Sequence, residues 1–191
     1  RSRGLGDVYK RQIQSLLSRQ VSEIIFLPVL LFPATHANED LPKRAQKALN
    51  KQVPYQILPT LGTTHAVEKF LLQQVTSVKD SRAEVLLIAH GTPHYQEPFK
   101  QLAQIASKLE RQLGRRVYPA DYYGEHPYLP ILEKHSEPMI IQRLFLTEGY
   151  LARKIKNNII EHRGAQDILL PTMQDSAALV SAILERLTPY I

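Results

Sequence analysis

The feature that most constrains the fold is an apolar segment that leads into a histidine and then into an acidic stretch. Residues 24–32 (IIFLPVLLF) are almost continuously apolar, as a strand covered on both faces must be. His36 follows in a predicted loop, and residues 38–40 (NED) suit the start of a helix, where acidic groups meet the positive end of the helix dipole. The stretch from Glu23 to Pro42 therefore predicts a buried strand, a loop holding His36, and a helix start.

A variant of this unit returns at residues 139–157, MIIQRLFLTEGYLARKIKN. When His36 is aligned with Tyr150 without gaps, the apolar pattern holds across the strand and into the helix. A second pair of blocks matches at nearly the same offset, residues 58–61 (LPTL) with residues 170–173 (LPTM). Two matching blocks in the same order predict a duplicated α/β unit of roughly a hundred residues.

The repeat predicts a division of the chain into three parts. Residues 1–12 carry four Lys or Arg, one Asp and no apolar period, so we interpret them as a non-native tail outside the fold. Residues 13–80 would be the C-terminal part of a first unit, and residues 82–191 a complete second unit. The first-unit equivalent of His90 would fall upstream of residue 1, so we expect that the natural protein has more chain at its N-terminus.

Apolar strand patterns and helix patterns alternate along the chain. The predicted strands cover residues 24–32, 55–61, 85–89, 117–123, 139–146 and 168–170. The predicted helices cover residues 13–22, 38–51, 65–75, 98–113, 127–135, 150–162 and 176–187. The alternation predicts an α/β fold of two tandem units, with mostly parallel four-stranded sheets flanked by helices and the first unit incomplete.

Composition removes several classes of protein and site. The chain has no cysteine, so it holds no disulfide or thiolate metal site, and this suits a cytoplasmic protein. No apolar run is long enough to cross a membrane. The formal net charge of +6 falls to +3 without residues 1–12, which gives no strong indication of nucleic acid. We therefore expect neither a membrane nor a nucleic-acid partner.

His36 is the leading candidate for chemistry. It follows the predicted C-terminal end of a buried strand, where ligands bind in open α/β sheets. A neutral imidazole accepts a proton near pH 7 or binds a divalent metal. Glu39 and Asp40 are close enough in sequence to orient it or to bind metal themselves. The alternative is an ordinary polar side chain in a loop that caps the helix.

His90 follows a second buried strand and precedes Gly91. A His-Gly pair at a strand end lets an imidazole and backbone N–H groups face one crevice, although the same pair is typical of a simple turn. Histidine phosphatases place an arginine before such a pair to hold phosphate, whereas Ala89 stands in that position in this chain, which disfavours phosphoryl transfer. His94 and His126 are near enough to approach His90 but are more typical of exposed polar residues.

Two further groups leave both a structural and a binding interpretation open. A tyrosine cluster could wall a flat ligand, but core and rim packing is its usual role. A basic run suits a solvated helix face, and it could also receive an anionic ligand. The cluster is Tyr118, Tyr122, Tyr123 and Tyr128, and the run is Arg153, Lys154 and Lys156.

Two motifs and the duplication together resemble the class II chelatases, the sirohydrochlorin cobaltochelatases and ferrochelatases. Residues 85–92 (VLLIAHGT) are similar to the opening strand and His-Gly-Ser/Thr motif of that family. Residues 26–42 (FLPVLLFPATHANEDLP) are similar to its second signature, an apolar strand, a histidine and an acidic helix start. The resemblance covers nearly all of the chain after residue 12.

The resemblance implies a working pair of histidines in one half of a long member, with a carboxylate nearby. His36 matches the second histidine of the first half, and its partner in that pair would lie upstream of residue 1. His90 matches the first histidine of the second half. Tyr150 stands where the second half would have its other histidine, and Tyr123 or a neighbour stands where the family has a glutamate. The resemblance therefore implies that the native site is in the first half.

The implied activity is insertion of Co²⁺ or Fe²⁺ into a sirohydrochlorin-type tetrapyrrole, for cobalamin or siroheme biosynthesis. The metal is then a substrate, and no bound organic cofactor is implied. We expect His36 to be catalytic, and His36 and His90 to contact the metal, while the substrate-binding residues stay open. The alternatives are a non-catalytic module that binds a tetrapyrrole or metal, and a second half that serves only as structural support.

Overall fold

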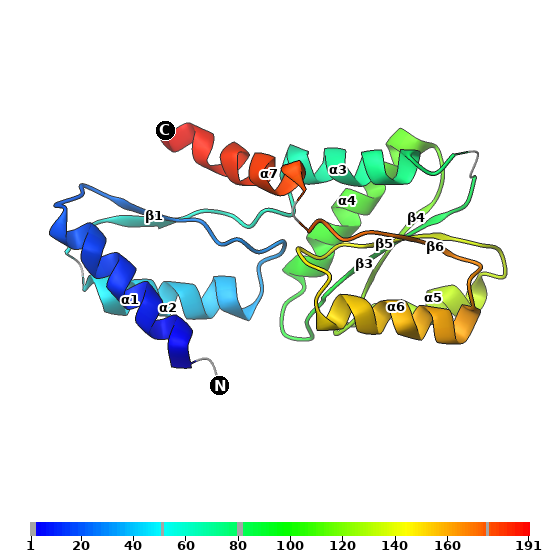
Figure 1. The fold of residues 1–191 in the computed structure, drawn as a ribbon, viewed down its shortest axis with the longest axis horizontal. Helices are drawn as coiled ribbons and strands as arrows, with labels where there is room; N and C mark the ends of the chain where they lie inside the picture. Colours follow the sequence, from blue (N-terminus) through cyan, green and yellow to red (C-terminus); the bar gives the residue numbers. More distant parts are fainter. Residues whose placement is uncertain (1–2, 51, 80–81, 175) are drawn as a thin grey trace.

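The computed structural model describes residues 3–50, 52–79, 82–174 and 176–191. Helices and parallel strands alternate along the chain, as predicted (Figure 1). The first part contains α1 (Arg3–Ser18), β1 (Ile24–Phe26), the π-helical turn η1 (His36–Asp40), α2 (Leu41–Leu49), β2 (Tyr55–Ile57) and α3 (His65–Thr76). The second part contains β3 (Val85–Ala89), α4 (Glu97–Leu113), β4 (Val117–Asp121), α5 (Leu129–Lys134), β5 (Ile140–Arg143), α6 (Tyr150–Arg163), β6 (Ile168–Leu170), α7 (Ala177–Leu187) and the short 3₁₀ turn η2 (Thr188–Tyr190).

The larger sheet has four parallel strands in the order β4-β3-β5-β6. All five residues of β3 are buried, because helices cover both faces of the sheet. Leu86 and Ile88 point to one face and pack with α5 and α6, whereas Leu87 points to the other face and packs with α3, α4 and α7. This alternation follows from the two-residue period of a strand. The α/β fold with parallel sheets is confirmed.

The smaller sheet consists of β1 and β2, paired in parallel with Ile24 opposite Tyr55. Ile13 of α1 and Leu49 of α2 pack with Ile24 in a core of their own. Within the described residues, no helix is both long and apolar enough to cross a membrane.

Two helices cross from one part of the molecule to the other. Val67 and Leu71 of α3 are fully buried in the core of the four-stranded sheet. The second helix, α7, follows β6 of the four-stranded sheet and extends toward the small sheet (Figure 1). The Arg186 guanidinium donates to the Thr60 carbonyl at 2.7 Å, and the Glu185 carboxylate accepts from the first backbone N–H groups of α3. The division near residue 81 stays a prediction about the repeat, since the packed core is continuous across it.

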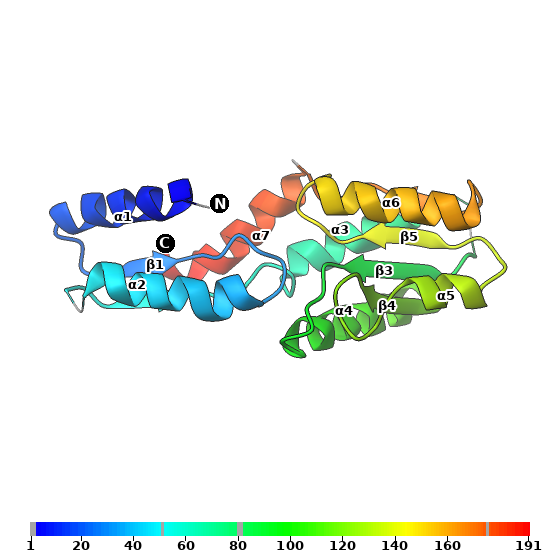
Figure 2. The same cartoon turned by 90° about the horizontal axis from the view of Figure 1, so that it is seen from below.

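The carboxyl ends of the strands in both sheets point toward the middle of the molecule (Figure 1 and Figure 2). The amino ends of α2 and α6, which carry the aligned residues His36 and Tyr150, lie in this same region. The two sheets therefore face each other at the ends where open α/β sheets bind ligands.

The predicted strand over residues 24–32 is too long, since β1 ends at Phe26. Pro28 has no backbone N–H and cannot donate to a strand ladder. The chain beyond it still meets the segment after β2, where the Leu61 N–H donates to the Leu30 carbonyl at 2.8 Å. The predicted loop position of His36 is also wrong. His36 is the first residue of η1, and η1 runs directly into α2.

The predicted first helix is misplaced at both of its ends. We expected residues 13–22 to be helical and residues 1–12 to lie outside the fold, but α1 runs from Arg3 to Ser18 without a break. Helix-compatible polar residues such as Arg, Lys and Gln extend a helix without any apolar period, so the sequence pattern gave no sign of this extension. Residues 1–2 of the predicted tail and residue 51, where we predicted the end of the second helix, lie outside the described residues.

Candidate functional site

His36 forms an ion-pair-type contact with a carboxylate one helical turn away. Its Nδ1 lies 2.8 Å from Oδ2 of Asp40, within the turn where η1 passes into α2. The imidazole side chain is 80% exposed and the carboxylate is 43% exposed. A carboxylate on Nδ1 fixes the proton there and leaves Nε2 with its lone pair directed outward. The sequence expectation that Asp40 orients His36 matches this geometry.

Glu39 joins the two halves of the molecule. Its carboxylate accepts from the Lys43 ammonium at 3.0 Å and from the hydroxyl of Tyr95, which lies between β3 and α4. The Tyr95 hydroxyl, followed by Lys43, lowers the pKa of Glu39, because both hydrogen bonds favour the ionised carboxylate. The same contact raises the pKa of Tyr95. Glu39 is thus held as an anion beside the His36–Asp40 pair.

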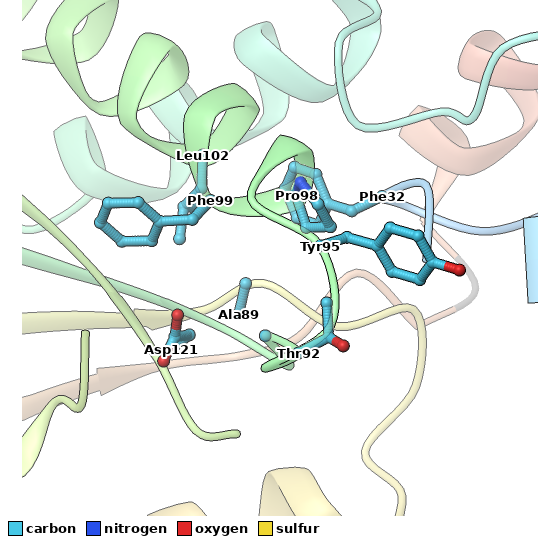
Figure 3. Close-up of a pocket in the computed structure, with 9 residues that line it drawn as sticks. Phe32, Ala89, Thr92, Tyr95, Pro98, Phe99, Leu102 and Asp121 are labelled. Carbon is cyan, nitrogen blue, oxygen red and sulfur yellow. The ribbon is translucent and has the colours of Figure 1, made fainter. Parts of the chain in front are cut away.

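A small pocket lies beneath this junction (Figure 3). Phe32, from the segment before His36, lines it together with Tyr95 and Pro98, while Ala89 and Asp121 at the ends of β3 and β4 line it from below. The pocket is mostly apolar, and its walls come from both halves of the chain. It explains how the segment that carries His36 is held against the four-stranded sheet.

His90 is exposed at the end of β3. Its Nδ1 lies 2.7 Å from the Gly91 carbonyl, and its ring lies 5.2 Å from the Tyr123 ring, centroid to centroid. Within the described residues no hydrogen bond or ring contact joins His90 to His36. His126 does not reach His90 either, because it stacks on Phe99 with the ring centroids 3.6 Å apart.

Asp121 is a buried carboxylate that the sequence interpretation missed. It ends β4, is only 2% exposed, and accepts from the Gly124 N–H at 2.8 Å. Gly91 adopts a φ of +70°, and a Cβ built on it would lie 2.4 Å from Cβ of Asp121. The glycine of the His-Gly motif is therefore required both for its backbone angle and for space. Its place near a strand end was a usable signal, but its burial depends on contacts with Gly91 and Gly124 that no local pattern reports.

The aligned positions in the second unit carry the opposite charge. His36 aligns with Tyr150, and on the same alignment Asp40 falls on Lys154. Tyr150 is 74% exposed at the first turn of α6. The Lys154 ammonium lies 5.6 Å from the centroid of the Tyr122 ring. We call His36, Glu39 and Asp40 the histidine end, and Tyr122, Tyr123, Tyr150 and Lys154 the tyrosine end.

The metal-binding capacity of the site comes from few groups. Across the described ranges, no three His, Cys, Asp or Glu side chains gather closely enough to hold a metal ion. The histidine end offers one imidazole and one carboxylate in contact, and Glu39 beside them. Such a set can present a metal or take up a proton, and it is not a closed structural metal site.

Residues 7–78 match the family model CbiX. The match includes β1, His36 and β2, and it confirms the family resemblance drawn from the sequence. A comparison with curated protein sequences gives no match.

Three solved structures share the fold. SirB from Bacillus subtilis with Fe³⁺ has a TM-score of 0.82 at 18% identity, covering 94% of this chain and 75% of that chain. The sirohydrochlorin chelatase SirB from Bacillus subtilis subspecies spizizenii in complex with cobalt has a TM-score of 0.77 at 17% identity, covering 94% and 74%. CbiX, described as the terminal enzyme for siroheme biosynthesis in denitrifying bacteria, has a TM-score of 0.73 at 17% identity, covering 92% and 79%. At these identities the likeness establishes the fold of the chain.

Proposed function

We propose that this chain is a sirohydrochlorin-type chelatase, which inserts Co²⁺ or Fe²⁺ into a tetrapyrrole for cobalamin or siroheme biosynthesis. The observation that carries the proposal is the His36–Asp40 pair at the ligand-binding end of a parallel sheet, inside the segment that matches CbiX. Two solved structures with this fold hold a metal, Fe³⁺ in one and cobalt in the other, which supports a metal substrate.

His36 supplies the base in this proposal. Metal insertion displaces protons from the pyrrole nitrogens, and a neutral imidazole near pH 7 can accept one of them. Asp40 holds Nδ1–H, so Nε2 is free to face the metal or the proton. When Nε2 takes up a proton, the adjacent carboxylate stabilises the imidazolium. Glu39, kept ionised by Tyr95 and Lys43, adds negative charge that favours a divalent cation at this end.

His90 is the second group that contacts the metal in this proposal. It follows β3, in the second part of the chain, whereas His36 lies in the first part. Its ring is exposed at a strand end, as a ligand to a passing metal must be. Nitrogen and carboxylate donors together suit Fe²⁺ and Co²⁺. The choice between these two metals is part of the proposal.

A non-catalytic tetrapyrrole or metal carrier is the second candidate. Tyr150 and Tyr123, which stand where the resemblance implies a histidine and a glutamate, favour it for the second half. A carrier binds its ligand without accelerating metal insertion, so a rate measurement separates it from a chelatase.

The test is the absorbance change of sirohydrochlorin with added Co²⁺, in the wild type, His36→Ala and His162→Ala. We expect His36→Ala to lower the insertion rate about 100-fold or more, as the loss of a general base does. His162 is the matched control, because it is exposed in the last turn of α6 and its Nδ1 contacts the carbonyl of Asn158. The chelatase proposal fails if the wild type does not accelerate insertion, or if His36→Ala matches the wild type.

A further inference from the structure

The tyrosine end is an unassigned cluster at the strand ends opposite His36. Tyr122 and Tyr123 follow β4, while Tyr150 and Lys154 lie one turn apart at the start of α6. Tyr123 is 51% exposed and Tyr150 is 74% exposed, so two aromatic faces meet solvent where most large apolar side chains are covered. The rings of Tyr122 and Tyr123 pack edge to face at 4.5 Å, and this contact fixes their relative orientation.

The Lys154 ammonium is close to several of these tyrosines. It lies over the Tyr122 ring, and the Tyr122 hydroxyl is the main reason that the pKa of Lys154 is raised. The Tyr150 and Tyr123 hydroxyls act in the same direction. Lys154 is therefore a full cation at neutral pH, surrounded by hydroxyl groups that can donate hydrogen bonds.

The two ends differ in the sign of the ligand that they favour. At the histidine end, Asp40 and the ionised Glu39 favour a cation. At the tyrosine end, the aligned positions are Lys154 and Arg153. Arg153 donates to the carbonyl of Glu148 at 2.9 Å, which keeps its charge beside the loop that precedes α6. Phenol faces next to cations suit a flat ring that carries carboxylates.

We propose that Tyr123, Tyr150 and Lys154 form a binding surface for a flat polycarboxylate macrocycle, with the rings against its face and Lys154 on a carboxylate arm. The inference rests on the proposed function and deepens it, because it names the residues that hold the metal-free substrate. It also gives the second unit a task for which no histidine at position 150 is needed. The macrocycle would lie between this surface and His36, since the amino ends of α2 and α6 both lie in the middle of the molecule (Figure 2).

The test is an absorbance titration of the whole chain with uroporphyrin, without metal, for the wild type, Lys154→Glu, Tyr150→Ala and Lys156→Glu. Lys156 is the matched control, because it is an exposed lysine on the same helix. It lies two residues after Lys154 and therefore points to a different side of the helix. We expect Lys154→Glu to weaken binding about tenfold and Tyr150→Ala about threefold, with less than about a twofold change for Lys156→Glu. With coproporphyrin, which has half as many carboxylates, the loss in Lys154→Glu should shrink.

Two results would overturn the inference. One is that the wild type does not bind uroporphyrin, and the other is that Lys154→Glu and Lys156→Glu bind equally well. Circular dichroism of each variant checks that the fold is kept. We expect it to be kept, because the substituted side chains are exposed. The same preparations are then assayed for Co²⁺ insertion. Binding that depends on Lys154 without any insertion would defeat the chelatase proposal alone, and insertion without such binding would defeat this inference alone.

Discussion

On the repeat predicted from the sequence, the histidine end and the tyrosine end are two versions of one strand-to-helix unit. Each begins a helix at the carboxyl end of a parallel strand, and each places an ionisable side chain four residues after its first one. In the first version the pair is His36 and Asp40, joined at 2.8 Å. In the second it is Tyr150 and Lys154. The helix start is thus similar while the charge is inverted. Under the two proposals, the histidine end handles the metal and its protons, and the tyrosine end holds the anionic substrate.

The largest effect is expected when the histidine end is given the charge of the tyrosine end. Asp40→Lys puts an ammonium next to His36, which repels a divalent metal and disfavours the imidazolium. We expect Co²⁺ insertion to fall about 100-fold, whereas Asp40→Asn, which keeps an acceptor oxygen, should lose about tenfold. The comparison breaks if Asp40→Lys keeps more than half of the wild-type insertion rate.

A second substitution tests how tightly the end of β3 is built. Gly91→Ala forces a side chain into a backbone with φ of +70° and against Cβ of Asp121. We expect a loss of about 3 kcal/mol in the free energy of unfolding, about 1 from the backbone angle and about 2 from overpacking. Gly114 is the matched control, because its φ is +64° but nothing lies within 4 Å of a built Cβ.

Urea denaturation of both variants measures this difference. Gly114→Ala should lose only the backbone part, about 1 kcal/mol. Equal losses in the two variants would mean that the contact between Gly91 and Asp121 does not matter for stability, and that the His-Gly motif is kept for its backbone angle alone.

The smallest effect concerns the hydrogen bond from Tyr95 to Glu39, which joins the two halves of the molecule. Tyr95→Phe removes the hydroxyl that lowers the pKa of Glu39, so this pKa should rise toward its ordinary value in an NMR pH titration. In the wild type, the stabilisation from the ionised Glu39 is present above the ordinary pKa of a glutamate and is lost as the pH falls through the lowered value. We expect less than about a threefold change in Co²⁺ insertion, since His36 and Asp40 are untouched.

Tyr118→Phe is the control for that titration, because the Tyr118 hydroxyl donates to Glu84, outside both ends. An unchanged pKa of Glu39 in Tyr95→Phe would show that the two halves are not coupled through this contact.

Local patterns predicted most of the elements, and they singled out His36 as the leading candidate residue, which stays a prediction. Residues 85–89 became a buried strand and residues 65–75 became most of α3, because apolar periodicity and capping signals agree there. β1 ends before Pro28, which has no backbone N–H to donate to a strand partner. This proline was visible in the sequence and could have shortened the predicted strand. The exchange of α3 and α7 and the contact of Glu39 with Tyr95 were not predictable in this way. They join residues far apart in the chain, which no local period reports.

The proposed role of the tyrosine end rests on both the predicted repeat and the packing of the folded chain. The alignment of His36 with Tyr150 was available from the sequence, and it already places Lys154 opposite Asp40 in the repeat. That Lys154 lies against Tyr122 depends on how α6 packs near the turn after β4, which no local pattern reports. Asp121 was missed for the same reason, since its burial reflects the glycines that pack against it.

The most direct test of the two proposed roles is the steady-state kinetics of Co²⁺ insertion into sirohydrochlorin, measured for His36→Ala and Lys154→Glu. If the histidine end acts in metal insertion and the tyrosine end holds the substrate, His36→Ala lowers kcat with KM nearly unchanged. Lys154→Glu then raises KM about tenfold with kcat nearly unchanged. This division of labour is contradicted if Lys154→Glu lowers kcat as strongly as His36→Ala does, or if His36→Ala acts only on KM.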